Sequence, residues 1–580
     1  MSRRSWSVGA LLALLVVSGC AGIPSSGPVV QVPDDGDLGQ SAVRYSPARP
    51  LPGASPEQIV RGYLDAMLAF PASSRTASAF LTPEAAQEWR ASSQFRIYSN
   101  PEVTGSREPA ARSDPRTQPQ GDVTVRLGFT EDAVLDRQGR YARSAAPAAI
   151  TYTLQQVQGE WRITDPQDGL LINQKFFGDY FRPFNLYFFD RPGRRLVPDP
   201  IHLVVGDQLA TSLVSGLAGG PAKADEESSR SYVPPRSALR PSVPISDEGV
   251  ADVEFTDDFG DLSSTSRDHL SAQLVWTLRQ VPGVEAVQAV GGSTVLTAGG
   301  DEAQPVQAWG GYGPSTARGR AYGVVGNRVV EIDDGEIAPV SGSWGENARG
   351  AELVAVSEAG VAGVLAGRDR VRVTTRQGDA AQTIRGSGLI GPDWDSDGSV
   401  WLVDQVSTGT RVRLADVDAV RSIDVGALAD LDVLTFKISP DGTRYAVTTP
   451  DSGGALYVGS ILRDVKNQVY GLGAPERVFT EADAPRSASW SSPTELSFLA
   501  ESPSGVQVYQ AAIDGSKTTS EVSRSGALLP DVAAETLAIG QGSSPVLYVT
   551  DGEGQLWSLP SGGSWQRIDT GGVTGLSYGR

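Results

Sequence analysis

A repeated pattern in residues 301–580 constrains the fold of this chain more than any other feature. Two segments, 391–403 and 436–447, each place hydrophobic residues on both sides of an Asp-Gly pair, and their glycines, Gly398 and Gly442, lie 44 residues apart. Related segments lie at 487–499 and 546–557, and a degenerate one lies at 321–330. A period in the forties with strands around a tight turn is typical of β-propellers. We therefore predict an all-β propeller of about six blades for residues 301–580.

The first 54 residues predict export and lipid attachment. Arg3 and Arg4 precede an apolar run that is shorter than the ~20 residues needed to span a bilayer. The run ends in Val-Ser-Gly before Cys20, the only cysteine of the chain, which resembles the lipobox of bacterial lipoproteins. We therefore predict a signal peptide at 1–19, a lipidated Cys20 with a flexible linker at 20–54, and a location on the extracytoplasmic face of the cell membrane. An ordinary signal peptide with an incidental cysteine is the alternative.

Composition narrows the classes of function. The net charge of −19 disfavours nucleic acids and anionic lipid headgroups as partners. A single cysteine allows neither a disulfide framework nor a zinc–cysteine site. The only two histidines, His202 and His269, lie far apart in the sequence, so a Ser-His-Asp or Cys-His site is not expected. We predict a non-enzymatic protein without a cofactor, and catalysis by paired carboxylates stays open as an alternative.

Residues 55–172 are predicted to form an α+β domain. Ser55 and Gln58 form a capping box that opens an amphipathic helix, and Thr82 is placed to cap a second, short helix. Alternating hydrophobic residues indicate strands at 123–129, 150–157 and 160–163. Helices followed by such a meander resemble the small, cone-shaped domains of the nuclear-transport-factor-2-like (NTF2-like) type.

Residues 173–300 are predicted to contain connecting strands and a second α+β domain. The aromatic stretch at 173–200 is interpreted as two buried strands, with a ligand platform as the alternative. Helices are expected at 207–217 and 269–280, and strands at 251–255 and 285–290. This order, with the motifs at 216–221, 250–253 and 278–284, resembles the GerMN domain. The resemblance implies binding or assembly, and we expect His269 to be a surface or packing residue.

One group of acidic residues matches a calcium-binding pattern. Asp393, Asp395, Asp397 and Asp404 stand at positions 1, 3, 5 and 12 of such a loop, with Gly398 at position 6. The same residues belong to the propeller repeat, where Asp397 and Gly398 would form a hairpin turn. We favour the turn, and therefore predict no metal site.

The order of the segments resembles the LpqB family of actinobacterial lipoproteins. Residues 181–190, 193–200 and 207–214 look like the central segment of that family, and Ser439-Pro-Asp-Gly442 resembles the repeat of TolB-type propellers. The resemblance implies an accessory protein that contacts the extracytoplasmic domain of a sensor kinase of the MtrB type. It would thereby influence signalling to MtrA and so cell-wall and division processes.

Two further functions stay open. One is a membrane-anchored receptor for an envelope glycan or muropeptide, in which exposed aromatic rings could stack on sugars. The candidate rings belong to Trp309, Tyr312, Trp344 and Trp394, although packing within the blades is the expected role of each. The other is a hydrolase with paired carboxylates, for which no pair of residues is favoured by position.

Overall fold

Residues 47–580 are described by the computed structural model, apart from 70–73, 107–121, 234–238, 241, 257–258, 260–261, 301, 315–318, 334, 376–380, 416–418, 451–453, 479–481, 483 and 542–544. They belong to one unit, Ser41–Arg580. Cys20 and the expected signal peptide lie outside the described residues. Within the described ranges, no helix is long and apolar enough to cross a membrane.

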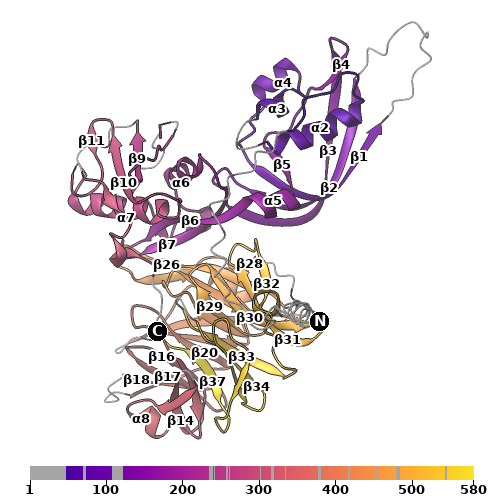
Figure 1. Cartoon of the computed structure of the whole chain (residues 1–580). Coiled ribbons are helices and arrows are strands. Elements are labelled where there is room, and N and C mark those ends of the chain that lie inside the picture. Colours follow the sequence, from indigo (N-terminus) through magenta and orange to yellow (C-terminus); the bar gives the residue numbers. More distant parts are fainter. Residues whose placement is uncertain are drawn as a thin grey trace, which may run out of the picture. The chain divides into compact units, whose positions relative to one another are not determined.

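The first domain is a five-stranded sheet covered by short helices (Figure 1). The helices are α2 (Pro56–Met67), α3 (Arg75–Ser78) and α4 (Pro83–Glu88), and the sheet has the order β4-β3-β2-β1-β5. Its strands are β1 (Phe95–Ser106), β2 (Val123–Leu135), β3 (Tyr141–Val157), β4 (Glu160–Ile163) and β5 (Leu170–Asn173). The predicted capping box is confirmed, because Ser55 accepts from Gln58 N while the Gln58 side chain accepts from Ser55 N at 2.8 Å.

The aromatic stretch at 173–200 contains two strands, as predicted: β6 (Phe181–Asp190) and the beginning of β7 (Leu196–Val204), which pair antiparallel. It differs from the prediction at its start, which is the helix α5 (Gln174–Tyr180). The reason is local, since the Asn173 side chain accepts a hydrogen bond from Phe176 N at 2.7 Å and so caps the helix. Phe176 and Phe177 are buried in the first domain, and Phe188 and Phe189 in the second.

The second domain follows the predicted order of helices and strands closely. It contains α6 (Leu209–Ala218), η1 (Lys223–Asp225), β8 (Ser229–Arg230), β9 (Val250–Phe255), α7 (Ser264–Leu278), β10 (Ala286–Gly291), β11 (Thr294–Val295) and β12 (Gln304–Pro305). Strands β9 and β10 pair in parallel, with Ala251 opposite Val287. Helix α7 contacts both β6 and β10, so its buried residues join the two sheets of this domain.

Six small sheets follow, each with its strands in antiparallel order. From the innermost strand outward, blade 1 consists of β37 (Thr574–Tyr578), β13 (Ala321–Val325), β14 (Arg328–Asp333) and β15 (Glu336–Pro339). Blade 2 consists of β16 (Ala351–Val356), β17 (Gly360–Leu365), β18 (Arg370–Thr375) and β19 (Ala381–Arg385). Blade 3 consists of β20 (Leu389–Trp394), β21 (Val400–Val406), β22 (Gly409–Ala415) and β23 (Val420–Ser422). Blade 4 consists of β24 (Thr435–Ile438), β25 (Arg444–Thr448), β26 (Leu456–Arg463) and β28 (Glu476–Val478), with β27 (Val469–Leu472) also paired to β26. Blade 5 consists of β29 (Ala488–Ser492), β30 (Glu495–Ser502), β31 (Gly505–Ala512) and β32 (Thr518–Ser520). Blade 6 consists of β33 (Ala534–Ile539), β34 (Leu547–Asp551), β35 (Leu556–Leu559) and β36 (Gln566–Ile568). Short helices lie between strands: η2 (Gly310–Tyr312), α8 (Ser343–Glu346), η3 (Gly426–Asp430) and α9 (Glu521–Ser525).

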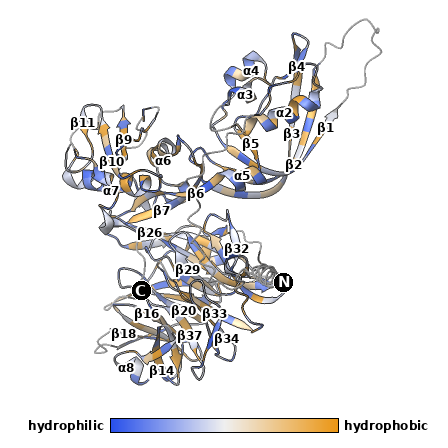
Figure 2. Ribbon diagram, in the orientation of Figure 1, coloured by the Kyte–Doolittle hydropathy of each residue, from blue (hydrophilic) through white to orange (hydrophobic). Residues whose placement is uncertain are grey.

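The sheets form a closed ring, as a β-propeller requires. The inner strands contact one another in the order β37, β16, β20, β24, β29, β33 and back to β37. The ring closes because β37, from the end of the chain, pairs with β13 from its beginning, with Tyr578 opposite Ala321. Hydrophobic residues occur throughout the strands of the propeller (Figure 2), and apolar side chains of neighbouring blades pack together in shared clusters. The predicted propeller of about six blades is therefore confirmed.

The repeats do not all occupy the same place in their blades. Segments 391–403, 436–447 and 487–499 each contain the two innermost strands of a blade, whereas 321–330 and 546–557 contain the second and third strands. Both places nevertheless have a four-residue turn that ends in a glycine at positive φ: Gly442 N–H donates to Ser439 O at 2.9 Å in blade 4, and Gly554 N–H donates to Asp551 O at 3.0 Å in blade 6.

Candidate functional site

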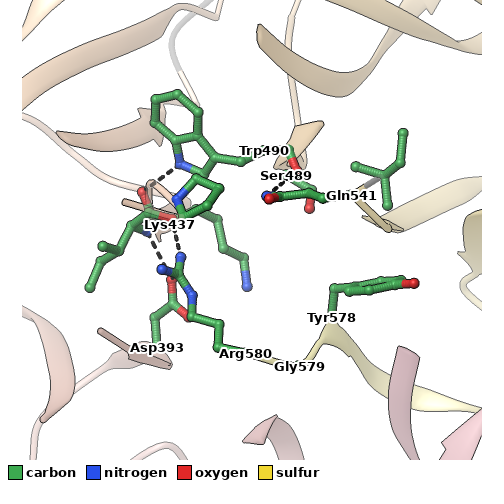
Figure 3. Close-up of a pocket in the computed structure, with 11 residues that line it drawn as sticks. Asp393, Lys437, Ser489, Trp490, Gln541, Tyr578, Gly579 and Arg580 are labelled. Carbon is green, nitrogen blue, oxygen red and sulfur yellow. Dashed lines mark hydrogen bonds and ion pairs between the residues drawn. The ribbon is translucent and has the colours of Figure 1, made fainter. Parts of the chain in front are cut away.

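The ends of the inner strands of five blades surround a small cavity in the propeller (Figure 3). Its volume is about 40 Å³. Strands β20, β24, β29, β33 and β37, with the residues just after them, supply the lining. The polar residues that line it are Asp393, Lys437, Ser489, Trp490, Gln541, Tyr578 and Arg580. We call this cavity the channel mouth.

Arg580 ties several blades together at the channel mouth. Its Nη1 donates to the carbonyl oxygen of Ser439 at 2.7 Å, its Nη2 donates to that of Ile438, and Nη2 lies 3.5 Å from Asp393 Oδ2. The same carboxylate oxygen accepts from Ile438 N at 2.8 Å. The main chain of Arg580 is also held, since its N–H donates to Val356 O at 3.0 Å. The guanidinium and the Asp393 carboxylate therefore neutralise each other where blades 3 and 4 meet β37.

Lys437 brings a second positive charge to the channel mouth. Its main-chain carbonyl accepts from Trp490 Nε1 at 3.2 Å, and Gln541 Nε2 donates to Trp490 O at 3.3 Å, so blades 4, 5 and 6 are linked around it. In Figure 3 no hydrogen bond or ion pair joins Lys437 Nζ to the other residues drawn. Tyr578 closes another side, and burial, with the charge of Asp333, raises the pKa of its phenol. The channel mouth thus combines an ion pair, a half-buried lysine residue and neutral polar groups.

The four aspartates of the calcium pattern have protein donors as partners. Asp395 accepts from the N–H groups of Asp397 and Ser399, from Trp401 Nε1 and from Arg463. The remaining three pair with arginines: Asp393 with Arg580, Asp397 with Arg194 and Arg463, and Asp404 with Arg411 and Arg413. Among the described residues, no three Asp, Glu, His or Cys side chains are grouped to hold a metal ion. The residue pair Asp397-Gly398 lies in the turn between β20 and β21, with Gly398 at φ +84°.

The two histidines lie in different parts of the structure and contact different residues. His269 lies on α7, with its ring stacked on Tyr232 at 4.3 Å and its nitrogens against the carbonyl oxygens of Thr265 and Gly193. His202 lies on β7, and its Nε2 is 3.0 Å from Asp514 Oδ2 of the propeller. His269 is therefore a packing residue, as expected.

Several polar contacts join the second domain to the propeller. Arg194 pairs with Asp397 at 2.8 Å, and Arg444 pairs with Asp225 at 2.8 Å and donates to Pro198 O at 3.1 Å. Burial alone would raise the pKa of Asp397, but the hydrogen bond from Asn467 and the charges of Arg463 and Arg194 bring this pKa below its ordinary value. Arg444 is buried, so the ion pair that it forms with the Asp225 carboxylate lies inside the protein and joins the second domain to the propeller.

The candidate stacking residues are engaged in packing. Trp394 is buried and donates to Ala355 O at 3.0 Å, and the half-buried Trp309 stacks on Tyr312. Trp344 is 1% exposed, and the Arg372 guanidinium lies 3.7 Å from its ring centre. A second cavity, of about 240 Å³, lies beside Trp344 between blades 1 and 2 and also touches Tyr322 and Thr374. The Trp344 Nε1–H has no hydrogen-bond partner in the described part of the chain.

Three features of this region were not predicted from the sequence. Two of them are the residues Lys437 and Arg580, which line the channel mouth. The available signal for Lys437 was its position between the hydrophobic residues Phe436 and Ile438, which are buried on an inner strand. Residues 575–579 also match the G-x-S-x-G motif of serine hydrolases. That motif requires a sharp turn between a strand and a helix, whereas Ser577 is buried within β37. The match therefore reflects the small residues of a closing strand.

The fold and the channel mouth define a multidomain protein with two α+β regions followed by a C-terminal β-propeller. Family models match each region: "Lipoprotein LpqB, N-terminal domain" at residues 49–178, "Sporulation and spore germination" at 185–292 and "Lipoprotein LpqB beta-propeller domain" at 327–576. Lipoprotein LpqB of Mycolicibacterium smegmatis is 30% identical over 483 residues, which cover 77% of this chain and 78% of the relative. That of Thermobifida fusca is 28% identical over 593 residues, which cover 89% and 90%.

The chain therefore belongs to the LpqB lipoprotein family. Among solved structures, TolB from Acinetobacter baumannii is similar, with a TM-score of 0.34 and 13% identity, covering 55% of this chain and 86% of TolB.

Proposed function

We propose that the protein is a lipid-anchored, non-catalytic accessory of a sensor kinase of the MtrB type. In this proposal Cys20 carries the lipid, and the domains bind the extracytoplasmic part of the kinase to tune signalling to MtrA and hence cell-wall and division processes. Membership of a lipoprotein family that is not known for enzymes supports the proposal.

One observation carries the non-catalytic role. The side chains best suited to chemistry, His202, His269 and the aspartates between 393 and 404, have hydrogen-bond or ion-pair partners that hold elements of the fold together. A general base also needs access to a reacting group, and both histidines and Asp393, Asp395 and Asp404 are buried. Binding, in contrast, needs only a stable body with an accessible polar surface, and a closed propeller provides one.

The experiment is a binding titration. The purified full chain, with Cys20→Ser for solubility, is titrated with the purified extracytoplasmic domain of the sensor kinase. Saturable binding that is lost when residues 301–580 are removed supports the proposal, provided that residues 47–300 remain folded by circular dichroism. Absence of binding to the intact chain contradicts it.

The alternative is a receptor for an envelope glycan or muropeptide. The cavity of about 240 Å³ beside Trp344 favours it, because a buried indole N–H without a partner can donate to a ligand oxygen. Saturable quenching of tryptophan fluorescence by cell-wall fragments, abolished in Trp344→Phe, would favour this function over the first.

A further inference from the structure

We propose that the chain consists of two bodies that can move apart, and that a clasp of polar contacts closes one onto the other. The front body (residues 47–313) contains the first and second domains, and the propeller body (residues 319–580) contains the six blades. Opening of the clasp uncovers charged side chains on blades 3, 4 and 5. This inference goes beyond the proposed function and does not depend on it.

The end of the front body follows from the packing of the segment after β12. Trp309 and Tyr312 pack against hydrophobic clusters of the second domain, and the ring centre of Tyr312 lies 5.4 Å from that of Phe189. The main-chain carbonyl of Trp309 accepts a hydrogen bond from Trp276 Nε1 of α7 at 3.1 Å, and Gly313 lies against the same indole ring. This segment is therefore fixed to the second domain.

The clasp begins with two contacts between charged or polar side chains. In the turn between β6 and β7, Arg194 pairs with Asp397 of blade 3 at 2.8 Å. On β7, His202 Nε2 lies 3.0 Å from Asp514 Oδ2, in the turn between β31 and β32 of blade 5. The second domain thus contacts two blades that flank blade 4.

The remaining contacts of the clasp involve η1 and the residues after it. Asp225, at the end of η1, pairs with Arg444 of blade 4 at 2.8 Å. Two hydrogen bonds also join this segment to blade 4: from Ser460 Oγ to Ala224 O at 3.2 Å, and from Tyr470 OH to Glu227 Oε2 at 3.1 Å. Three neighbouring blades are therefore tied to the front body by polar groups.

Hydrophobic packing differs between the clasp and the front body. Among the described residues, no hydrophobic cluster contains side chains from both bodies. Within the front body, in contrast, one strand takes part in two clusters: Phe181 of β6 packs in the cluster of the first domain and Phe184 in that of the second. We therefore expect the first two domains to stay together when the clasp opens.

A polar junction opens more readily than an apolar one. Arg444 and His202 are buried when the clasp is closed, so closing removes water from groups that it hydrates well. The lost hydration offsets much of the attraction between the paired charges. For this reason, polar interfaces between the domains of one chain commonly allow relative motion.

Distances between pairs of spin labels on the full chain test the proposal. Cys20→Ser removes the only native thiol, and new thiols are placed at exposed positions, one in each domain: Gln87→Cys, Glu248→Cys and Ser561→Cys. The pair at 248 and 561 reports on the clasp, because it spans the second domain and the propeller. The pair at 87 and 248 reports on the front body and is the internal control.

The clasp is weakened by reversing two of its charges. Arg194→Asp together with Asp225→Arg keeps the net charge but sets like charges against Asp397 and Arg444. We expect this reversal to shift more than half of the molecules to a new distance between 248 and 561, and to leave the distance between 87 and 248 unchanged. The matched control reverses an exposed ion pair within the second domain, by Arg240→Glu with Glu254→Arg, and should change neither distance.

Circular dichroism establishes that each altered chain is folded. An unchanged distance between 248 and 561 in the reversed chain overturns the proposal, and so does an equal change in the distance between 87 and 248. If the reversed chain does not fold, the unaltered chain decides in a series of salt concentrations. Two distances between 248 and 561 then support the proposal, and a single distance at every salt concentration overturns it.

Discussion

His202 Nε2 lies 3.0 Å from Asp514 Oδ2, although 312 residues separate the two in the sequence. The His202 ring also lies against the rings of Tyr141 and Phe177, at 5.7 and 5.5 Å, and its main-chain N–H donates to Gly139 O at 2.8 Å. Burial alone would raise the pKa of Asp514, but the hydrogen bond and charge of His202 outweigh it and lower this pKa. One residue of β7 thus contacts both the first domain and the propeller.

The His202–Asp514 contact should be measurable as a coupling energy. Truncation of either side chain to alanine leaves the other buried polar group without its partner, so each single variant should be less stable. The double variant should lose less than the sum, with a coupling of ~1–3 kcal/mol. Denaturant unfolding of the four proteins of this cycle checks the prediction. A coupling near zero would mean that the contact does not hold the domains together.

The Asp397 carboxylate makes part of the stability dependent on pH. Its pKa in the folded protein lies below the ordinary value, so the stabilisation is complete above the unfolded pKa of ~3.9 and is lost as pH falls through the folded pKa. Asp397→Asn should therefore be less stable than the unaltered chain at neutral pH, and the difference should shrink in acid. Denaturant unfolding at a series of pH values measures it. If the difference in the free energy of unfolding between the two proteins stays constant down to about pH 2, the pKa of Asp397 is not lowered in the folded protein.

The ion pair at the channel mouth should stabilise the closed ring. Arg580→Met removes the cation beside Asp393, whose side chain is 11% exposed, and leaves that carboxylate with main-chain donors alone. We expect a loss of ~1–3 kcal/mol in the free energy of unfolding. Arg567→Met, on the exposed part of β36, serves as the control and should change it little. Equal stability of the Arg580→Met and Arg567→Met variants would show that the ion pair contributes nothing.

The predicted lipid anchor has a simple test. If Cys20 carries the lipid, Cys20→Ser should move the protein from the membrane fraction to the soluble fraction without changing its circular dichroism spectrum. Fractionation of cells expressing each form measures the change. Retention of the variant in membranes, after washing with high salt to remove bound partners, would argue against lipidation at this residue.

The propeller was predictable because its turns have a recognisable local sequence. Gly398 and Gly442 both lie at positive φ, +84° and +72°, so the Asp-Gly pairs mark real hairpins at a regular spacing. The strand that closes the ring carries no such signal. Residues 574–578 pair with 321–325 only through tertiary structure, and no local pattern links the two. The helix α5 was predictable in principle from the cap at Asn173, but its many aromatic residues favoured strands.

The candidate site was less predictable than the fold. Lys437, Asp393 and Arg580 are brought together by closure of the ring, which sequence spacing does not encode. The aspartates of the calcium pattern were recognised, but their partners, such as Arg463 for Asp395, lie in another blade. The contact between His202 and Asp514 likewise depends on how two domains meet.

We propose that this protein acts by binding a sensor kinase at the membrane. In-cell crosslinking of the tagged full-length protein, followed by mass spectrometry of the captured proteins, tests it most directly. We expect the sensor kinase to be captured reproducibly, and its capture to fall when residues 301–580 are deleted. Recovery of cell-wall fragments with no kinase, from cells in which the kinase is present, would contradict the proposed binding to a kinase.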